Sequence, residues 1–271
     1  MIEFQHVTFV HQNGVRALDD VSLTIEPGQT VAIVGENGAG KTTLVKHVTG
    51  LLKPASGAVL VDGKKTSETT TAQLSKIVGV AFQNPDHQLF SESVEEEMSF
   101  ALRNFDFPPE LVEQRVSWGL QLFGLDEYRK SSPLVLSGGE KKRLTLACIL
   151  AWDPAVVILD EPTVGQDSIQ KEKLSQTIRM LGAAGKTVVV VSHDIEFLWP
   201  MQPRVVVMKA GRVVGDGDAA KVMQDRELLE SARVAEPQLV TFYRSLASRP
   251  KSPFVDPLEA RRWVEGGAAP K

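Results

Sequence analysis

The sequence predicts an α/β fold in which a mainly parallel sheet is joined by an N-terminal antiparallel β subdomain, a helical insertion and a small C-terminal extension. Two short β-branched apolar runs, Thr30–Val34 and Thr187–Val191, are typical of strands buried on both faces. Segments of helical period alternate with such strands, which favours parallel strands covered by helices. Between about 90 and 150 the helical period dominates, and this stretch is the predicted insertion.

The first third of the chain is rich in strand signals. Asn13-Gly14 marks a turn among apolar and alternating residues. A helix is expected from Lys41 to Gly50, because Gly50 and the following Pro54 end the helical pattern. The strands expected here are Ile2–Phe4, Val7–Val10, Val21–Ile25, Thr30–Val34, Ala58–Val61 and Val78–Phe82.

Strands and helices alternate again after the insertion, which favours one domain over residues 1–220 and an extension over 221–271. Asp218 is a candidate cap for a helix through Met223, and the proline-rich stretch beyond it predicts a loose tail. The expected helices are Ser93–Asn104, Pro109–Phe123, Gly138–Ala151 and Ser168–Leu181, and the expected strands are Val156–Leu159, Thr187–Val191 and Val205–Met208.

Composition excludes several classes of partner. The net charge of −4 argues against nucleic acid as a main partner, because phosphate backbones require an excess of Lys and Arg. The longest apolar runs, Leu146–Trp152 and Thr187–Val191, are far shorter than the ~18 residues of a membrane span. The N-terminus lacks the basic start and apolar core of a signal peptide. The single cysteine, Cys148, is expected in the core of a protein kept in a reducing compartment.

A glycine-rich loop follows the strand Thr30–Val34 and opens a helix. It matches G-x-x-x-x-G-K-[ST], a pattern whose backbone N–H groups surround phosphates, and it predicts a P-loop NTPase core that binds ATP. Lys41 should reach the β- and γ-phosphates, and the Thr42 hydroxyl should ligate Mg²⁺. The predicted nucleotide-binding residues of this loop are Gly35, Glu36, Asn37, Gly38, Ala39, Gly40, Lys41, Thr42 and Thr43.

Two adjacent carboxylates end the apolar strand Val156–Leu159. Consecutive side chains on a strand point in opposite directions, so Asp160 and Glu161 can serve different roles. We expect Asp160 to hold Mg²⁺ and Glu161 to polarise the attacking water as general base. The alternative is a solvated Asp-Glu pair at a strand end.

A second loop, Leu136-Ser137-Gly138-Gly139-Glu140, also opens a helix, and a helix start is a site for anions. Together with the first loop and the acidic strand, it resembles the nucleotide-binding subunit of ATP-binding cassette transporters. The family signature is L-S-G-G-Q, and Glu140 replaces the glutamine here. The resemblance implies that Ser137, Gly138 and Gly139 face the γ-phosphate held by another protomer, so that two chains enclose two ATP molecules. Residues 1–220 would then be the cassette domain.

Other positions match the family in the same order. The resemblance implies that Gln83 senses Mg²⁺ and the attacking water, and that His193 is the switch histidine at the γ-phosphate. It also implies that Pro162–Asp167 is the loop that crosses the dimer interface, although Gln166 stands where leucine is more usual. His11 occupies the position of the aromatic residue that stacks on adenine, and a solvated loop histidine is the alternative.

The segment Gln83–Phe90 resembles its counterpart in energy-coupling factor transporters, which import vitamins and transition metals such as cobalt or nickel. Leu89 and Phe90 would supply an exposed apolar contact to an integral membrane partner, or they pack on the helical insertion. The resemblance implies a peripheral subunit at the cytoplasmic face of the membrane. It would be a homodimer or a heterodimer with a similar ATPase, closed by ATP binding and opened by hydrolysis.

Other functions stay open at this stage. A soluble mechanical cassette ATPase is one alternative, although coiled-coil insertions, zinc motifs and a fused second cassette are not seen in the sequence. A regulatory module without turnover is disfavoured by Glu161. Within transport, the subunit of an exporter or of another importer is the nearest alternative. The sequence does not name the cargo, because the membrane partners would select it.

Overall fold

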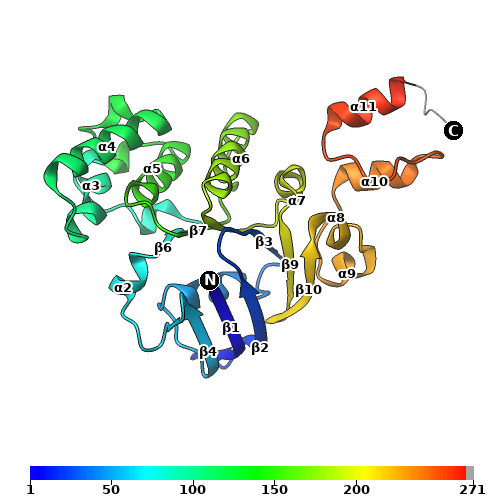
Figure 1. The fold of residues 1–271 in the computed structure, drawn as a ribbon, viewed down its shortest axis with the longest axis horizontal. Helices are drawn as coiled ribbons and strands as arrows, with labels where there is room; N and C mark the ends of the chain where they lie inside the picture. The colour runs from blue at the N-terminus through cyan, green and yellow to red at the C-terminus, as the bar shows by residue number, and fades with distance from the viewer. Residues whose placement is uncertain (267–271) are drawn as a thin grey trace.

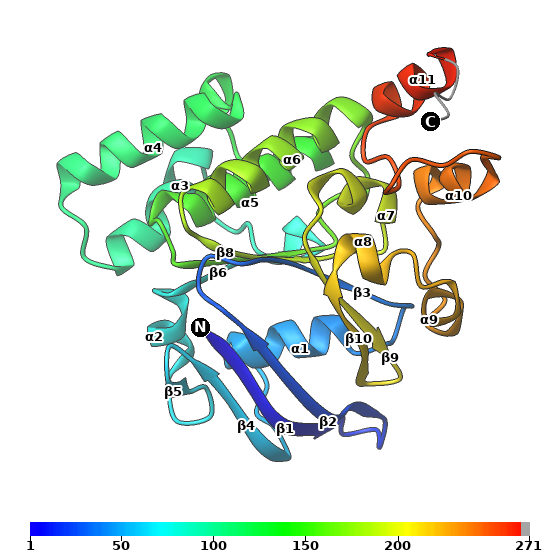
Figure 2. The same ribbon diagram turned by 45° about the vertical axis from the view of Figure 1, so that its right-hand side comes forward.

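The computed structural model describes residues 1–266 and contains two sheets with helices around them (Figures 1 and 2). The larger sheet has six strands in the order β10-β9-β3-β8-β7-β6, and the smaller has four in the order β2-β1-β4-β5. Figure 2 shows α1 between the two sheets and α5 and α6 on the opposite side of the larger one. The architecture is therefore layered, as the alternating sequence pattern predicts.

The smaller sheet is antiparallel and holds the N-terminus. Its first strand is continuous where two short strands are expected, because the chain accommodates an extra residue near His6. The backbone of His6 has a φ of 49°, and the pairing with both neighbours shifts there, as at a β-bulge. The strands are β1 (Ile2–Val10), β2 (Arg16–Ile25), β4 (Ser56–Val61) and β5 (Lys64–Lys65).

Five strands of the larger sheet are parallel, and β10 pairs antiparallel with β9 at one edge. β10 is not among the predicted strands, because Gly215 and Gly217 interrupt its apolar pattern. The strands are β3 (Thr30–Val34), β6 (Val78–Ala81), β7 (Val156–Asp160), β8 (Thr187–Val191), β9 (Arg204–Lys209) and β10 (Arg212–Asp218).

Alternate residues of the larger sheet enter two separate cores. Val31 and Ile33 of β3 pack with α1 and the smaller sheet, whereas Ala32 and Val34 pack on the side of α5 and α6. The helices of this part are α1 (Lys41–Val48), α2 (Thr71–Ser75), α6 (Ser168–Ala183) and α7 (Ile195–Leu198). A third core lies among the insertion helices, which are α3 (Val94–Asn104), α4 (Pro109–Phe123) and α5 (Gly138–Ala151).

The C-terminal extension packs against the larger sheet. Ala232 and Val240 are fully buried in the same core as the α6 face, and the Trp199 indole donates a hydrogen bond to the Phe254 carbonyl at 2.8 Å. The expected loose tail contains helices, and residues 267–271, with Pro270, lie outside the described part. Asp218 directly precedes α8 but does not cap it through its side chain. The helices are α8 (Ala219–Val222), α9 (Arg226–Ser231), α10 (Gln238–Ser245) and α11 (Pro257–Glu265).

His47 of α1 gives the fold a dependence on pH. It is fully buried, its Nδ1 donates to the Thr43 carbonyl at 2.8 Å, and the Phe9 ring lies edge-on with its centroid 4.9 Å away. Burial lowers the pKa of His47, so the folded state keeps it neutral while the unfolded chain takes up a proton below about pH 6.5. His47 therefore destabilises the fold as the pH falls through that value.

We expect His47→Phe to reduce the loss of stability between pH 7.5 and pH 5.5, because the substituted side chain binds no proton in either state. Urea denaturation at the two pH values measures this loss. His87→Phe is the matched control, since His87 is exposed and has no acidic partner in a salt bridge among the described residues. Equal losses in the wild type and in His47→Phe would contradict the assignment.

Candidate functional site

A cleft of about 310 Å³ lies at the carboxyl ends of the central parallel strands. It gathers residues from the turn after β1 and the start of β2, from the glycine-rich loop and the start of α1, and from the segments that follow β6, β7 and β8. Such an edge of a parallel sheet is a common place for a ligand. The lining residues are His11, Val15, Ala17, Asn37, Gly38, Gly40, Lys41, Thr42, Thr43, Gln83, Glu161 and His193.

The glycine-rich loop needs its glycines where the chain turns closely against β9 and β2. Gly35 and Gly40 have φ values of 150° and 102°. A Cβ atom on Gly35 would lie 2.2 Å from the Met208 carbonyl oxygen, and one on Gly40 would lie 2.4 Å from that of Ala17. The loop then enters α1 at Lys41, so its N–H groups and the helix N-terminus face the same cleft.

The Lys41 ammonium is buried at the base of the loop. It donates to the carbonyl oxygens of Gly35 at 2.7 Å and Glu36 at 3.0 Å. Burial lowers the pKa of Lys41, and the carboxylates of Glu161 and Asp160 oppose this effect. The Lys41 side chain is already ordered by these backbone oxygens. It can therefore exchange them for phosphate oxygens with little further loss of side-chain conformational entropy.

Asp160 is buried beside the start of α1. The Thr42 hydroxyl donates to Asp160 Oδ2 at 3.0 Å, and Asp160 Oδ1 is buried without a hydrogen-bond partner among the described residues. Burial is the main cause that raises the pKa of Asp160. Thr42 and Gln83 line the cleft, and Asp160 adjoins it through its contact with Thr42. The unpartnered Asp160 oxygen, the Thr42 hydroxyl and the Gln83 amide oxygen are ligands of the kind that fit Mg²⁺.

Glu161 leaves the strand instead of continuing it. β7 ends at Asp160, and Glu161 has a φ of 50°, so strand alternation does not explain the separate placement of the two carboxylates. The Glu161 N–H donates to the Val191 carbonyl at 2.8 Å, and His193 Nδ1 donates to Glu161 Oε2 at 2.7 Å. This left-handed conformation is unfavourable for a non-glycine residue, and contacts with β8 and His193 hold it.

Gln83 and His11 also line the cleft. Gln83 follows β6, and His11 follows β1 with its ring centroid 5.0 Å from that of Phe9 in an edge-on arrangement. Val15 and Ala17 line the cleft too and are not among the predicted site residues. Nothing in the sequence marks them as site residues, because small aliphatic residues near the Asn13-Gly14 turn belong to no recognisable motif.

The second loop lies outside this cleft within one chain. Ser137 caps α5: its hydroxyl accepts from the Glu140 N–H at 3.3 Å, and Glu140 Oε2 accepts from the Ser137 N–H at 2.8 Å. Glu140 therefore fills the reciprocal role of a capping box in place of the family's glutamine. A Cβ atom built on Gly138 or Gly139 would meet nothing within 4 Å, so both glycines face open space.

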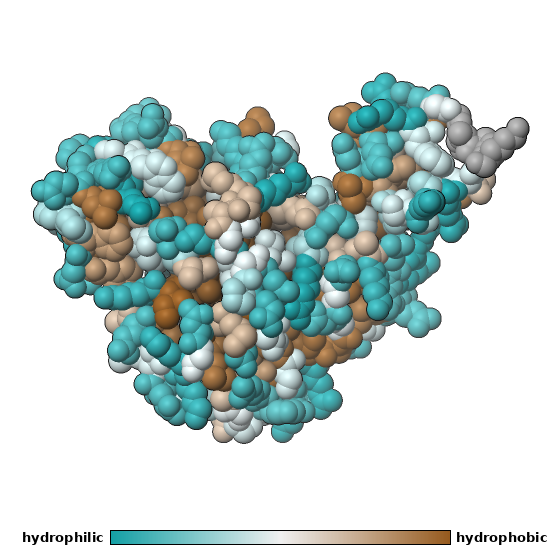
Figure 3. Space-filling model, in the orientation of Figure 1, coloured by the Kyte–Doolittle hydropathy of each residue, from teal (hydrophilic) through white to brown (hydrophobic). Residues whose placement is uncertain are grey.

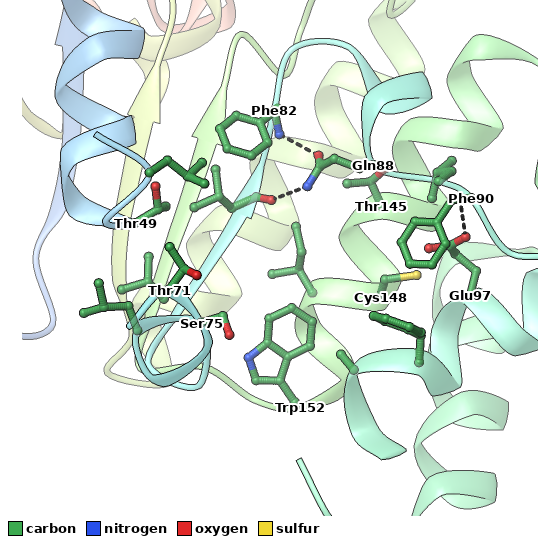
Figure 4. A pocket seen from close by; sticks show the side chains of 18 residues that line it. Thr49, Thr71, Ser75, Phe82, Gln88, Phe90, Glu97, Thr145, Cys148 and Trp152 are labelled. Atoms are coloured by element: carbon green, nitrogen blue, oxygen red, sulfur yellow. Dashed lines mark hydrogen bonds between the residues drawn. The ribbon is translucent and has the colours of Figure 1, made fainter. Parts of the chain in front are cut away.

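A second, more apolar groove of about 290 Å³ lies between the larger sheet and the insertion helices (Figure 4). Figure 3 shows apolar side chains gathered near this junction. Phe90 is 66% exposed and lies edge-on to Phe100 at 4.8 Å, whereas Leu89 is buried in the insertion core. The prediction of an exposed contact is therefore wrong for Leu89, because its side chain packs among α3, α4 and α5.

The segment from Gln83 to Phe90 is held at several points. The Gln88 side chain accepts from the Phe82 N–H and donates to the Val80 carbonyl, both at 2.8 Å (Figure 4). Lys141 of α5 pairs with Asp86 at 2.7 Å. The Phe90 N–H donates to the buried Glu97 carboxylate at 2.8 Å. These contacts join the segment to β6, to α5 and to α3.

The fold and the cleft define the class of protein: an α/β ATPase with a phosphate loop at the end of its first parallel strand. A family profile described as ABC transporter matches residues 18–164. The chain belongs to the ABC transporter ATP-binding family. It is accordingly an ATP-binding protein, of the class that hydrolyses ATP in step with transport.

Curated relatives support this assignment. An ABC transporter ATP-binding protein of Pyrococcus furiosus is 43% identical over 92% of this chain and 95% of its own length. The energy-coupling factor transporter ATP-binding protein EcfA of Methanothermobacter thermautotrophicus is 38% identical over 88% and 77%. An ABC transporter ATP-binding protein of Methanosarcina acetivorans is 43% identical over 86% of this chain, which spans only 38% of that relative.

Solved structures share the fold and confirm the predicted fold class. CbiO1 from Clostridium perfringens, part of the ABC transporter complex CbiONQ, aligns with a TM-score of 0.74 and 32% identity over 90% of this chain and 98% of its own. A dimeric ATP-binding cassette in a post-hydrolysis state, bound to ADP and phosphate, aligns with a TM-score of 0.74 and 31% identity over 80% and 98%. Over residues 1–266, every helix is too short or too polar to span a membrane.

The buried charge of Asp160 predicts that Asp160→Asn stabilises the protein without nucleotide. A raised carboxyl pKa means that the ionised form weakens folding at neutral pH, and asparagine removes that charge while still accepting from Thr42. We expect a gain of about 1 kcal/mol, or roughly 2–4 °C in Tm, by calorimetry at pH 7.5.

The gain should shrink at acid pH, where protonation neutralises Asp160 in the wild type. Asp20→Asn is the matched control, because the Asp20 side chain is 69% exposed and its loss of charge should be nearly neutral. A lower Tm for Asp160→Asn at pH 7.5 would contradict the prediction.

Proposed function

We propose that this chain is the ATP-hydrolysing subunit of an importer of the energy-coupling factor type, which takes up a vitamin or a transition metal. The observation that carries the proposal is the segment Gln83–Phe90, which joins the nucleotide cleft at one end to the apolar groove at the other. The names of the EcfA relatives and of the CbiO1 neighbour support the same branch of the family.

The cleft residues have distinct roles in this proposal. Backbone N–H groups from Gly35 to Thr43 and the Lys41 ammonium bind the phosphates, and His11 stacks on adenine. Thr42, Asp160 and Gln83 would hold Mg²⁺, whose charge would stabilise the negative charge on the phosphates.

Hydrolysis in this scheme depends on Glu161 and His193. Glu161 accepts the proton of a water whose oxygen forms a bond to the γ-phosphorus, while the bond from that phosphorus to ADP breaks. The His193 Nδ1–H holds one carboxylate oxygen of Glu161 and leaves the other for the water. His193 itself is 61% exposed on its side chain, so it lies where the γ-phosphate would meet solvent or another chain.

The active form in this proposal is a homodimer or a heterodimer with a similar ATPase. Ser137, Gly138 and Gly139 lie at the exposed start of α5 and not in their own chain's cleft, and open space beside both glycines allows a phosphate of another chain to approach. Pro162–Asp167 would cross the interface between the chains. The dimeric cassette bound to ADP and phosphate supports this arrangement.

The apolar groove is the proposed docking site for integral membrane subunits, which would place this chain peripherally at the cytoplasmic face of the membrane. Phe90 and Phe100 present aromatic surface at its rim, and the buried Glu97 fixes the backbone of Phe90. We also propose residues 1–220 as the cassette domain, with a helical subdomain over about 90–150, and 221–271 as the C-terminal extension.

Glu161→Gln should keep ATP affinity but lower turnover by at least about 100-fold, because the glutamine amide cannot accept the proton. Steady-state phosphate release and equilibrium ATP binding separate the two effects. Gel filtration with ATP should then show a trapped dimer. Turnover close to that of the wild type would refute the assignment of Glu161 as general base.

Lys41→Ala should lose ATP affinity, because the phosphates would lose their buried ammonium partner. Isothermal titration with a non-hydrolysable ATP analogue measures the change. Lys46→Ala on the same helix is the control for the loss of one positive charge. The phosphate-loop assignment would fail if Lys41→Ala bound the analogue as tightly as Lys46→Ala does.

Phe90→Ser should weaken association with the membrane subunits more than it changes ATPase activity in solution, because it removes exposed aromatic surface at the groove. Co-purification from native membranes and phosphate release measure the two quantities. Trp118→Ser on α4, 43% exposed and away from the groove lining, is the matched control. Unchanged co-purification of Phe90→Ser would argue against this docking site.

A further inference from the structure

An ion pair joins the C-terminal extension to the phosphate loop. Arg233 Nη1 lies 3.0 Å from Glu36 Oε2, and the two residues are 197 positions apart in the chain. Glu36 is the one acidic residue of the sequence from Gly35 to Thr43. The pair is therefore the contact through which the extension reaches the loop that carries the phosphate-binding groups.

Arg233 is held in a defined conformation at the end of α9. Its φ is 52°, in the left-handed region where glycine is the usual residue after a helix. The Val234 N–H donates to the Leu229 carbonyl at 2.9 Å, which closes the helix end, and Leu229 and Ala232 are buried. The backbone thus fixes the point from which the Arg233 side chain extends.

Both ends of the ion pair rest on the hairpin of β9 and β10. On the loop side, Gly35 packs against the Met208 carbonyl, and the Gly211 N–H donates to the Ala39 carbonyl at 3.0 Å. On the side of the extension, Leu228 packs so closely on Gly215 that a Cβ there would lie 2.6 Å away. The hairpin therefore fixes the position of α9 relative to the phosphate loop.

The Glu36 carboxylate contacts Arg233 and is not among the groups that line the cleft. Its neighbours Asn37 and Gly38 line the cleft and Glu36 does not, although all three belong to the same loop. A carboxylate free to turn toward bound phosphates would repel them, because like charges at short range disfavour each other. The contact with Arg233 keeps this negative charge outside the phosphate site.

We propose that Arg233 is a positioning residue for nucleotide binding, which restrains the Glu36 carboxylate and makes the C-terminal extension part of the ATP site. The inference rests on the proposed role of the Gly35–Thr43 loop. Because coupling between sites is reciprocal, bound ATP must in turn stabilise the docked end of α9.

The test measures the affinity of the full-length chain for a non-hydrolysable ATP analogue with Mg²⁺, by isothermal titration in low salt. Arg233→Gln should bind about two- to fivefold more weakly, the range expected for an exposed ion pair. Arg233→Lys should stay near the wild type, because it keeps the charge. Arg226→Gln is the matched control, since Arg226 pairs with Glu230 on the same helix.

Two double variants of equal net charge, Arg233→Gln with Glu36→Gln and Arg233→Gln with Glu227→Gln, separate restraint of Glu36 from a general effect of charge, because Glu227 is exposed on the same helix. Restraint predicts that only the variant that lacks the Glu36 carboxylate recovers wild-type affinity, whereas a general effect of charge predicts recovery in both. Unchanged affinity in Arg233→Gln, a defect that Glu36→Gln does not reverse, or recovery in both double variants overturns the proposal. Lys41→Ala tests the nucleotide site independently of Arg233. If the wild type binds the analogue and Lys41→Ala does not, the phosphate-loop assignment holds whatever the result for Arg233→Gln.

Discussion

The parallel pairing of β7, β8 and β3 is the constraint on which the site depends. Ile33 of β3 and Asp160 of β7 both pair with Val191 of β8, so the three strands end level with one another. Asp160 is the last residue of β7, Glu161 and the phosphate loop follow their strands directly, and His193 lies two residues after β8. A one-residue slip in either ladder would turn the strand side chains to the opposite faces and separate the three groups. The relative placement of these groups is therefore set by backbone hydrogen bonds between buried strands.

Those strands are also the part of the fold that sequence patterns predict best. The limits of Thr30–Val34 and Thr187–Val191 agree with the structure, because an unbroken β-branched run has few other stable conformations. β10 could not be predicted, because its glycines interrupt the apolar alternation that is typical of a strand. Its extended conformation is fixed by pairing with β9. Pro237 and Pro257 suggest breaks, yet they precede or begin helices, where their fixed φ is favourable.

Some features of the candidate site can likewise be predicted from sequence, and others cannot. The sequence could place the loop through Lys41 and the Asp160–Glu161 pair at strand ends, because each directly follows or ends an apolar β-branched run. The left-handed backbone of Glu161 could not be predicted, since it results from contacts with β8 and His193. Leu89 and Phe90 are alike in sequence and opposite in exposure, and only the packing of α3 to α5 distinguishes them.

The side-chain amide of Gln88 has a consequence for solubility. β6 is the edge strand of the larger sheet, and an edge with free N–H and carbonyl groups is a template on which another chain can add a strand. Gln88 occupies both groups at Phe82 and Val80 from within its own chain, in the manner of a short covering strand. The same contact that joins cleft to groove thereby removes one donor and one acceptor from the edge on which another strand could add.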